Sequence, residues 1–311
     1  MHEFVSGFSS SQVFSPHADA SIAHRSGSGG SRLPSILLSL RACGENNTIP
    51  TLDWMRHAIS HGINGFQFDS TQTRSIETLG SVHSHVLREI RESVTITCRI
   101  GRCSVEDPPV GFGSRQHLLS CLDQFLQQTN LHYVDVLYAH RHDPLTPLAE
   151  TADALAAAVT QGKALRIGIS QYAPAPARCL LSMLEKRHIP IAACQVPYAL
   201  DNRWPEDGLF FVLKQYGVDC VATDVLGPGS LLNCPGTSGV LLDGLAAARG
   251  QTVWQLIHSW ALNNSHVTSV LSAPATLPQL DALGTVAQKS YFSGEEKKLI
   301  DSFFPSPSSF G

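Results

Sequence analysis

The feature that most constrains the fold of this chain is a regular alternation of short apolar runs and longer amphipathic segments. Six segments between the runs place apolar residues at helical spacing, as Leu52, Met55 and Ile59 do, and several end in Gly or Asn. These expected helical segments are residues 51–62, 115–129, 148–162, 176–187, 206–217 and 252–264. Such an alternation, repeated eight times with strands that are apolar along most of their length, predicts an α/β fold, a closed (β/α)8 TIM barrel of parallel strands. The eight expected strands are residues 35–42, 65–70, 94–101, 133–140, 164–170, 191–198, 219–226 and 267–273.

Composition is consistent with a large folded domain and excludes some partners. Of the 311 residues, 43% are hydrophobic and 15% are charged, which is enough apolar material for a substantial core. The net charge of −4 gives no basic footprint for nucleic acid or for an anionic membrane surface. No apolar run approaches the ~20 residues that a membrane-spanning helix needs. We therefore expect neither nucleic acid nor membrane as a partner.

The first thirty-one residues differ from the rest of the chain. Residues 1–31 are rich in Ser and Gly and lack a basic start followed by an apolar core, so we expect a flexible leader before a barrel domain at residues 32–311. The leader would be free to meet a neighbouring copy, which leaves a homo-oligomer open. The eight cysteines are scattered without a C-x-x-C pair, which is typical of reduced thiols in a cytoplasmic protein.

Polar residues end five successive expected strands. In barrels of this kind, the chemistry lies at the carboxyl ends of the strands. A cleft lined by these five side chains would hold a carboxylate, a cation, an imidazole, a hydroxyl and an amide; the alternative is that each residue only closes its strand. The five are Asp69, Arg99, His140, Ser170 and Gln195.

Other conspicuous residues have simpler interpretations. The histidines of the "HRH" at 140–142 have no spacing that enforces metal binding, so no metal site is predicted. Asp135 is expected to orient a neighbouring group rather than to act as an acid. Trp254 and Trp260 stand at helical spacing and are expected in the core. The segment "GPGSLLNCPGTSG", residues 227–239, has the composition of a loop that cradles phosphate, but loops of this composition commonly form only turns.

Several stretches of the chain are similar to one known family. The run "YVDVLYAHRHDPLTPLAETADALAAAVTQGKALRIGIS" resembles the aldo-keto reductase pattern, in which one strand ends in a histidine and the next in Gly-Ile-Ser. Together with "DNRWPEDGL", it resembles the branch that contains bacterial glyceraldehyde-3-phosphate reductases and the β subunits of potassium channels. "HGINGFQFDS" and "FSGEEKKLIDSF" also match, and the resemblance covers about residues 32–303. It implies the same barrel that the alternation predicts.

The resemblance also implies a catalytic site with two substitutions. The family's catalytic Asp, Tyr, Lys and His correspond here to Asp69, Arg74, Arg99 and His140. In the family, the tyrosine hydroxyl gives a proton to the carbonyl oxygen, and the lysine lowers the pKa of that hydroxyl. A guanidinium stays protonated and is a poor proton donor, so Arg74 cannot replace the tyrosine. Arg99 would keep the positive charge of the lysine without its compact shape, and we expect it to form an ion pair with Asp69, because opposite charges at two strand ends of one concave site attract.

The resemblance further implies NADPH as the cofactor. Ser170 and Gln195 match residues that hold the nicotinamide carboxamide, and Gln171 stands where the family usually has Asn. The aromatic residue that stacks on the nicotinamide corresponds to Thr223, and a nearby proline corresponds to Val225.

Three positions of the resemblance belong to the loop that wraps the pyrophosphate, Leu226, Gly229 and Leu231, where backbone amides can meet phosphate oxygens. Thr276 and Leu283 stand where the family contacts the adenosine phosphate, and Leu283 offers no polar group there.

Two classes of function follow. In the first, the protein is an oxidoreductase that reduces a small aldehyde or ketone with NADPH, and His140, directly or through water, acts as the acid while Asp69 and Arg99 set the field around the carbonyl oxygen. In the second, it is a catalytically deficient relative that uses the barrel for binding, sensing or assembly. A lyase or isomerase that works without the cofactor is a third route.

Overall fold

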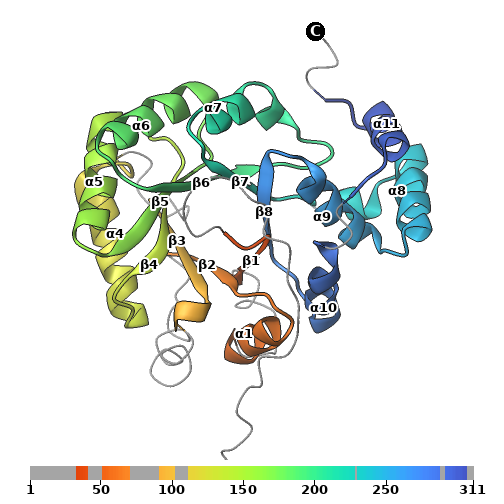
Figure 1. Cartoon of the computed structure of the whole chain (residues 1–311), viewed down its shortest axis with the longest axis horizontal. Coiled ribbons are helices and arrows are strands. Elements are labelled where there is room, and N and C mark those ends of the chain that lie inside the picture. The colour runs from red at the N-terminus through yellow and green to blue at the C-terminus, as the bar shows by residue number, and fades with distance from the viewer. Residues whose placement is uncertain are drawn as a thin grey trace, which may run out of the picture.

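The computed structural model describes residues 33–40, 51–70, 91–101, 111–227, 230–287 and 291–306, with the side chains of residues 51, 52 and 230 excepted. Eight parallel strands pair in sequence order and close into a barrel, because the first strand also pairs with the last (Figure 1). This confirms the predicted fold and all eight predicted strands. They are β1 (Ile36–Ser39), β2 (Gly65–Asp69), β3 (Thr95–Gly101), β4 (Val134–His140), β5 (Ala164–Ser170), β6 (Ile191–Pro197), β7 (Asp219–Thr223) and β8 (Val267–Ser272).

Helices surround the barrel on its outer side (Figure 1). All six expected helical segments contain a helix, although the segment at 206–217 starts later than expected, because Gly208 in the left-handed conformation precedes it. The described helices are α1 (Thr51–Ser60), α4 (Arg115–Thr129), α5 (Leu148–Thr160), α6 (Pro174–Lys186), α7 (Leu209–Gln215), α8 (Gly236–Ala248), α9 (Val253–Asn263), α10 (Leu277–Val286) and α11 (Gly294–Phe303). Short 3-10 turns occupy Arg91–Ser93, Trp204–Glu206 and Ser230–Asn233.

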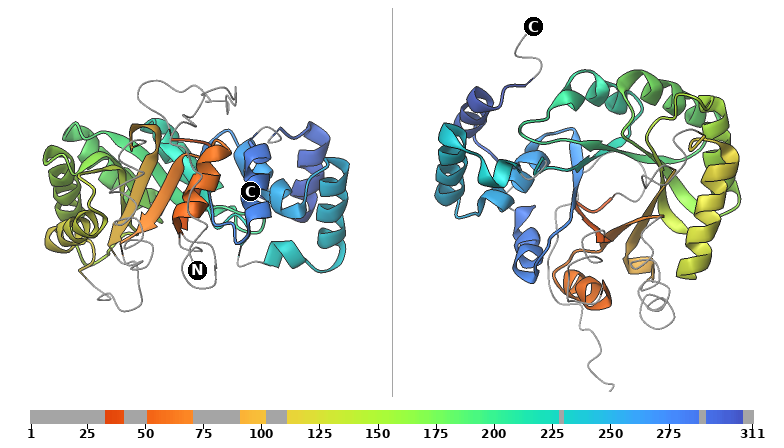
Figure 2. Two further views of the ribbon diagram at one scale, coloured as in Figure 1. Left: turned by 90° about the horizontal axis from the view of Figure 1, so that it is seen from below. Right: turned by 180° about the vertical axis from the view of Figure 1, so that it is seen from behind.

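The region after β7 is more helical than the sequence suggested. Residues 227–239 were expected to form turns only, but Ser230–Asn233 is a 3-10 helix and α8 begins at Gly236. Helices α8 and α11 lie beyond α9, farther from the barrel (Figures 1 and 2). Arg249, which ends α8, joins them through an ion pair of 2.9 Å with Glu296 of α11.

Two hydrophobic cores follow from the alternation of side chains along the strands. The larger core lies between the strands and the helices and includes Trp54, Trp254 and Trp260, so the expected core placement of the last two is confirmed. A small inner core fills the barrel itself. Its members are Leu33, Leu37, Val136, Tyr138, Ala192, Ala193 and Val221. Because strand residues two apart share a face, the residues two positions further along the inner face form the next layer toward the carboxyl ends.

One glycine makes room for the largest inner side chain. Tyr138 of β4 is fully buried, and Gly168 lies opposite it on β5. A Cβ atom on Gly168 would lie 2.2 Å from the Tyr138 ring. Only glycine therefore lets the tyrosine ring lie across the barrel at this level.

Two further expectations concern cysteines and membranes. No disulfide joins the described cysteines, which are Cys98, Cys121, Cys179, Cys194, Cys220 and Cys234. Within the described ranges, no helix combines the length and the apolar character that crossing a membrane requires. The predicted leader at residues 1–31 lies outside the described residues, so its flexibility stays a prediction.

Candidate active site at the carboxyl ends of the strands

Asp69 and Arg99 form a buried ion pair at the carboxyl ends of β2 and β3. They are direct partners in the parallel register. Arg99 donates from Nε to Asp69 Oδ1 at 2.7 Å and from Nη2 to Oδ2 at 2.9 Å. The side chains are 13% and 7% exposed, so the pair is largely removed from water. The predicted ion pair is confirmed, and its two-point geometry is one that a lysine could not make.

His140 ends the next strand along the barrel. It lies two residues beyond Tyr138, a member of the inner core, and so on the same face of β4. Tyr138 in turn stands opposite Arg99 in the register of β3 and β4. The imidazole therefore belongs to the layer above the inner core, on the strand that follows the Asp69–Arg99 pair.

Ser170 and Gln195 continue this layer on β5 and β6. They are register partners, and both are buried. The Ser170 hydroxyl and Gln195 Oε1 have no hydrogen-bond partner within the described part of the chain. A buried hydroxyl and a buried carbonyl side by side are costly when left unsatisfied, and they match the two sides of a carboxamide group.

A polar layer beneath the site was not singled out from the sequence. Gln67 of β2 accepts a hydrogen bond from Gln195 Nε2 across the barrel and another, at 3.4 Å, from the Thr97 hydroxyl. Gln67 precedes Asp69 by two residues, and Thr97 precedes Arg99 by two, so each lies below a site residue on the same face. The period of two was visible in the sequence, but the pairing of Gln67 with a residue so distant along the chain was not.

The chain turns sharply just after three of the strands that carry the site. Arg141, Gln171 and Asp224 follow β4, β5 and β7 directly, and each has a positive φ, of 58° at Gln171. The backbone N–H of Gln171 donates to the Gln195 carbonyl at 2.8 Å, which fastens this turn to β6. Left-handed residues other than glycine carry strain, and strained residues tend to cluster at active sites.

The remaining residues of the expected cofactor site have mixed placements. Leu226 is half-buried after β7, whereas Leu231 is packed into the larger core, so only its backbone is left for a ligand. Thr223 is buried at the end of β7 and donates to Asp224 at 3.1 Å. Arg74 and Gly229 lie outside the described residues.

Two expected contacts lie on α10. Thr276 is exposed and caps the helix, since its hydroxyl accepts from the Gln279 N–H at 3.4 Å. Leu283 is fully buried in the larger core, which explains why this position is apolar. Of the two, only Thr276 offers a polar side chain toward solvent.

Asp135 has the orienting role that we expected. Its Oδ2 accepts from the backbone N–H of Ile96 at 2.7 Å and pairs with Arg91 Nη1 at 2.9 Å. The residue thus joins β4 to β3 and to the turn before it, near the amino ends of the strands and away from the site.

A group of side chains outside the barrel was also not singled out from the sequence. His57 and His61 of the α1 region approach Asp281 of α10 closely enough to bind a metal ion together. The spacing of the two histidines was available as a signal, but nothing in the sequence linked them to Asp281, 220 residues after His61. This group is separate from the strand-end site.

Comparison with known proteins finds one family along most of this chain. The model of the aldo/keto reductase family matches residues 41–304. The L-glyceraldehyde 3-phosphate reductase of Escherichia coli O157:H7 is 32% identical over 88% of this chain and 90% of its own length. A probable aldo-keto reductase 1 from Glycine max is 24% identical over 76% of this chain and 74% of its own.

A solved structure has the same fold. It is an aldo/keto reductase from Klebsiella pneumoniae, determined in complex with NADP and acetate. The TM-score is 0.72, with 22% identity, over 88% of this chain and 93% of the other.

Proposed function

The chain belongs to the aldo/keto reductase family, and from that premise we propose that it binds NADP(H) at the carboxyl ends of the strands and reduces small aldehydes or ketones, with His140 as the proton donor. The observation that carries the proposal is the pair of buried, unsatisfied atoms on Ser170 and Gln195, within the part of the chain that the structure describes.

The cofactor part of the proposal depends on hydrogen-bonding chemistry. The Ser170 hydroxyl can donate to a carboxamide oxygen, and Gln195 Oε1 can accept from its NH2 group. Both groups are held in place by strand pairing, and Gln195 is further fixed by its hydrogen bond to Gln67. A nicotinamide carboxamide bound here would remove the cost of leaving these atoms unpaired. When bound, the cofactor would supply the hydride.

The proton must come from this chain or from water that it orients. Arg99 cannot give one, because a guanidinium stays protonated at ordinary pH. The imidazole of His140 is the described group at the predicted catalytic positions that can donate a proton near neutral pH. In this proposal, Asp69 and Arg99 form a fixed dipole beside the carbonyl oxygen. They do not serve to lower the pKa of a tyrosine hydroxyl.

The two-point contact between Arg99 and Asp69 supports a second candidate function. Because two nitrogens of the guanidinium donate hydrogen bonds to Asp69, the pair is rigid and poorly suited to proton transfer. In this alternative, the chain binds the dinucleotide and acts as a sensor or an assembly partner without efficient turnover.

The experiment that separates the two is a measurement of NADPH oxidation with a panel of small aldehydes. Glyceraldehyde 3-phosphate belongs in the panel because it is the substrate in the name of the E. coli relative. Loss of a general acid typically costs ~10²–10⁴-fold, so the His140→Ala variant should lose most of the turnover. His142→Gln, which changes a neighbouring imidazole packed against Tyr172, is the matched control and should keep it.

Each outcome has a clear meaning. Turnover that depends on His140 and not on His142 supports the reductase. NADPH binding without turnover favours the second candidate. Turnover that survives His140→Ala shows that the proton comes from elsewhere, and failure to bind either NADPH or NADH overturns both.

A further inference from the structure

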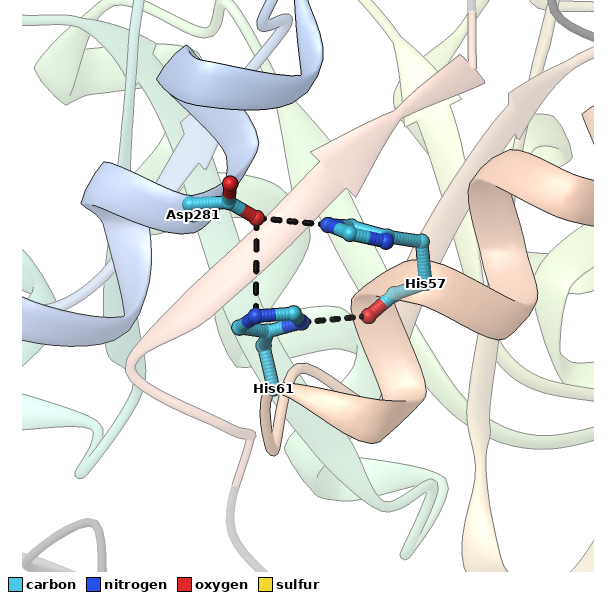
Figure 3. A group of neighbouring side chains, drawn as sticks. All are labelled: His57, His61 and Asp281. Carbon is cyan, nitrogen blue, oxygen red and sulfur yellow. Dashed lines mark hydrogen bonds and ion pairs between the residues drawn. The ribbon is translucent and has the colours of Figure 1, made fainter.

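We propose that His57, His61 and Asp281 form a binding site for a divalent transition-metal ion such as Zn²⁺, on the outer side of the barrel between α1 and α10 (Figure 3). Among the described residues, no other group of three histidine, cysteine or acidic side chains comes close enough together to hold an ion. The proposal is independent of the strand-end chemistry.

The two histidines are placed by the helix. They are four residues apart, at the end of α1 and in the turn that follows, so both side chains lie on one face. Their ring centroids are 4.4 Å apart, with an angle of 30° between the planes. This is the spacing by which two imidazoles on a helix commonly reach a single metal ion.

The third ligand comes from the opposite helix. Asp281 Oδ1 lies 2.5 Å from His57 Nε2 and 3.5 Å from His61 Nε2. In Figure 3, one carboxylate oxygen stands between the two rings. Ligand atoms about 2.0–2.1 Å from zinc at a tetrahedral angle would lie roughly 3.3 Å apart, so only small side-chain shifts would admit an ion.

The hydrogen bonding of His61 prepares it for metal binding. Its Nδ1 lies 2.9 Å from the backbone oxygen of His57. A carbonyl oxygen only accepts, so Nδ1 carries the proton and Nε2, which faces Asp281, presents its lone pair. Histidines that bind metals usually donate from the other ring nitrogen in this way, which fixes the tautomer and the ring orientation.

Both helices are held firmly against the core. Ala58, between the two histidines, is fully buried, and so are Leu280 and Leu283 on either side of Asp281. A Cβ atom on Gly284 would lie 3.7 Å from the His61 backbone oxygen, which shows how closely α10 approaches the end of α1. Ligands on packed helices keep their geometry better than ligands on loops.

The ligand set points to the chemistry of the ion. Two imidazoles and one carboxylate suit zinc, nickel or copper rather than calcium or magnesium, which prefer oxygen. The side chains of His57, His61 and Asp281 are 31%, 39% and 48% exposed, so an ion can enter from solvent and keep water in its open position.

The place of the site in the fold suggests what the ion does. Strands β1 and β8 pair to close the barrel, and α1 and α10 are the described helices that follow them. An ion bound by both helices would fasten the first part of the barrel to the last. His61 precedes β2 and so lies toward the amino ends of the strands, whereas Asp69 ends β2, which separates the ion from the site at the carboxyl ends.

The test is calorimetric titration of Zn²⁺ into the chelator-stripped full chain without a polyhistidine tag. One equivalent should bind to the unmodified protein. His57→Gln, His61→Gln and Asp281→Asn should each weaken that binding by at least about tenfold, since even the loss of an outer partner costs about 10–100-fold. His132→Gln, which removes an exposed histidine elsewhere, is the matched control and should leave it unchanged.

Thermal unfolding gives a second readout. Zn²⁺ should raise the unfolding midpoint of the unmodified protein and of His132→Gln, because an ion that binds only the folded state stabilises it. The increase should disappear in His61→Gln. This variant keeps the contact between His57 and Asp281, so it should still fold, and loss of the increase then reports loss of metal binding. Absence of binding by Zn²⁺, Ni²⁺ and Cu²⁺, or binding that all three ligand variants retain, overturns the proposal.

Discussion

Arg99 donates two hydrogen bonds to Asp69, of 2.7 and 2.9 Å, at the carboxyl ends of adjacent strands. The contact follows from the register, which sets the two Cα positions directly opposite each other. Because both side chains are largely buried, each charge is stabilised by the opposite charge of the other. A change to this pair should therefore affect both the stability of the folded protein and the chemistry of the proposed active site.

Breaking the pair should destabilise the barrel. Asp69→Asn removes the carboxylate that accepts two hydrogen bonds from the buried Arg99 side chain, and removal of one partner from a buried pair typically costs about 3–5 kcal/mol. The double variant Asp69→Asn with Arg99→Met should cost less than the sum of the two single changes. Urea unfolding measures all three free energies.

The matched control for this prediction is the exposed pair of Arg187 and Asp153, at 2.7 Å with side chains 33% and 54% exposed. Asp153→Asn should cost no more than about 1 kcal/mol, since surface pairs contribute little. If Asp69→Asn costs no more than Asp153→Asn, the pair of Asp69 and Arg99 is solvated and its burial has no energetic consequence.

Gly168 should not tolerate alanine. The added Cβ would lie 2.2 and 2.3 Å from two atoms of the Tyr138 ring, so the ring or the strand must move. Overpacking of this kind typically costs about 1–3 kcal/mol, measured by chemical unfolding. Gly244→Ala in α8, where a Cβ meets nothing within 4 Å, is the control and should gain roughly 0.5–1 kcal/mol. Tyr138→Leu should relieve the clash in the Gly168→Ala background; a loss that persists there would rule out the ring as its cause.

His258 should make stability fall in mild acid. Burial lowers the pKa of this histidine from 6.5 to about 4, because the charged form is poorly solvated inside the protein. Its Nδ1 contacts the Trp254 carbonyl and its Nε2 contacts the Ser272 hydroxyl, so the neutral ring is already satisfied.

The sign of the effect follows from linkage. The unfolded chain binds the proton more readily, so the stabilisation is complete above pH 6.5 and is lost as the pH falls toward 4. Between these limits the unmodified protein should lose about 3 kcal/mol more than His258→Gln, which cannot titrate there. Urea unfolding at several pH values measures both slopes, and parallel slopes would contradict the prediction.

Restoring the family's tyrosine and lysine should act cooperatively. Arg74→Tyr alone should recover little aldehyde reduction, since no lysine would lower the pKa of the new hydroxyl. Arg74→Tyr with Arg99→Lys should exceed the product of the two single effects on turnover, because residues that act as one unit are not additive. Rates of NADPH oxidation for the four proteins test this, with cofactor affinity measured separately. Independent effects of the two changes would show that positions 74 and 99 do not cooperate.

Much of the fold could be predicted because strands leave a strong local signal. Apolar runs such as 134–140 and 164–170, each followed by polar turn residues, were enough to place all eight strands and the barrel. Helix α8 was missed since Pro235 and two glycines, Gly236 and Gly239, are typical of turns. Its position against α9 and α11 is decided by tertiary packing, which local pattern does not record.

The sequence predicted the part of the site that consists of residues at the ends of neighbouring strands. Asp69 and Arg99 were expected to pair because parallel strand ends meet at one edge of the barrel, and the structure has that pair. Contacts across the barrel, such as Gln67 with Gln195, depend on which side chains reach over the inner core. The approach of His57 and His61 to Asp281 likewise depends on barrel closure, so only the three-dimensional structure reveals it.

Calorimetric titration of the protein with NADPH tests whether Ser170 and Gln195 form a nicotinamide site. The unmodified protein should bind NADPH saturably and one to one. Ser170→Ala should bind NADPH at least about tenfold more weakly, because a hydrogen bond to a buried partner is typically worth about 0.5–1.5 kcal/mol and an unsatisfied carboxamide adds to the loss. Ser269→Ala removes another buried hydroxyl, on β8, that has no hydrogen-bond partner among the described residues, and it should bind NADPH as the unmodified protein does. Absence of NADPH binding, or equal binding by Ser170→Ala and the unmodified protein, would show that Ser170 and Gln195 do not form a nicotinamide site.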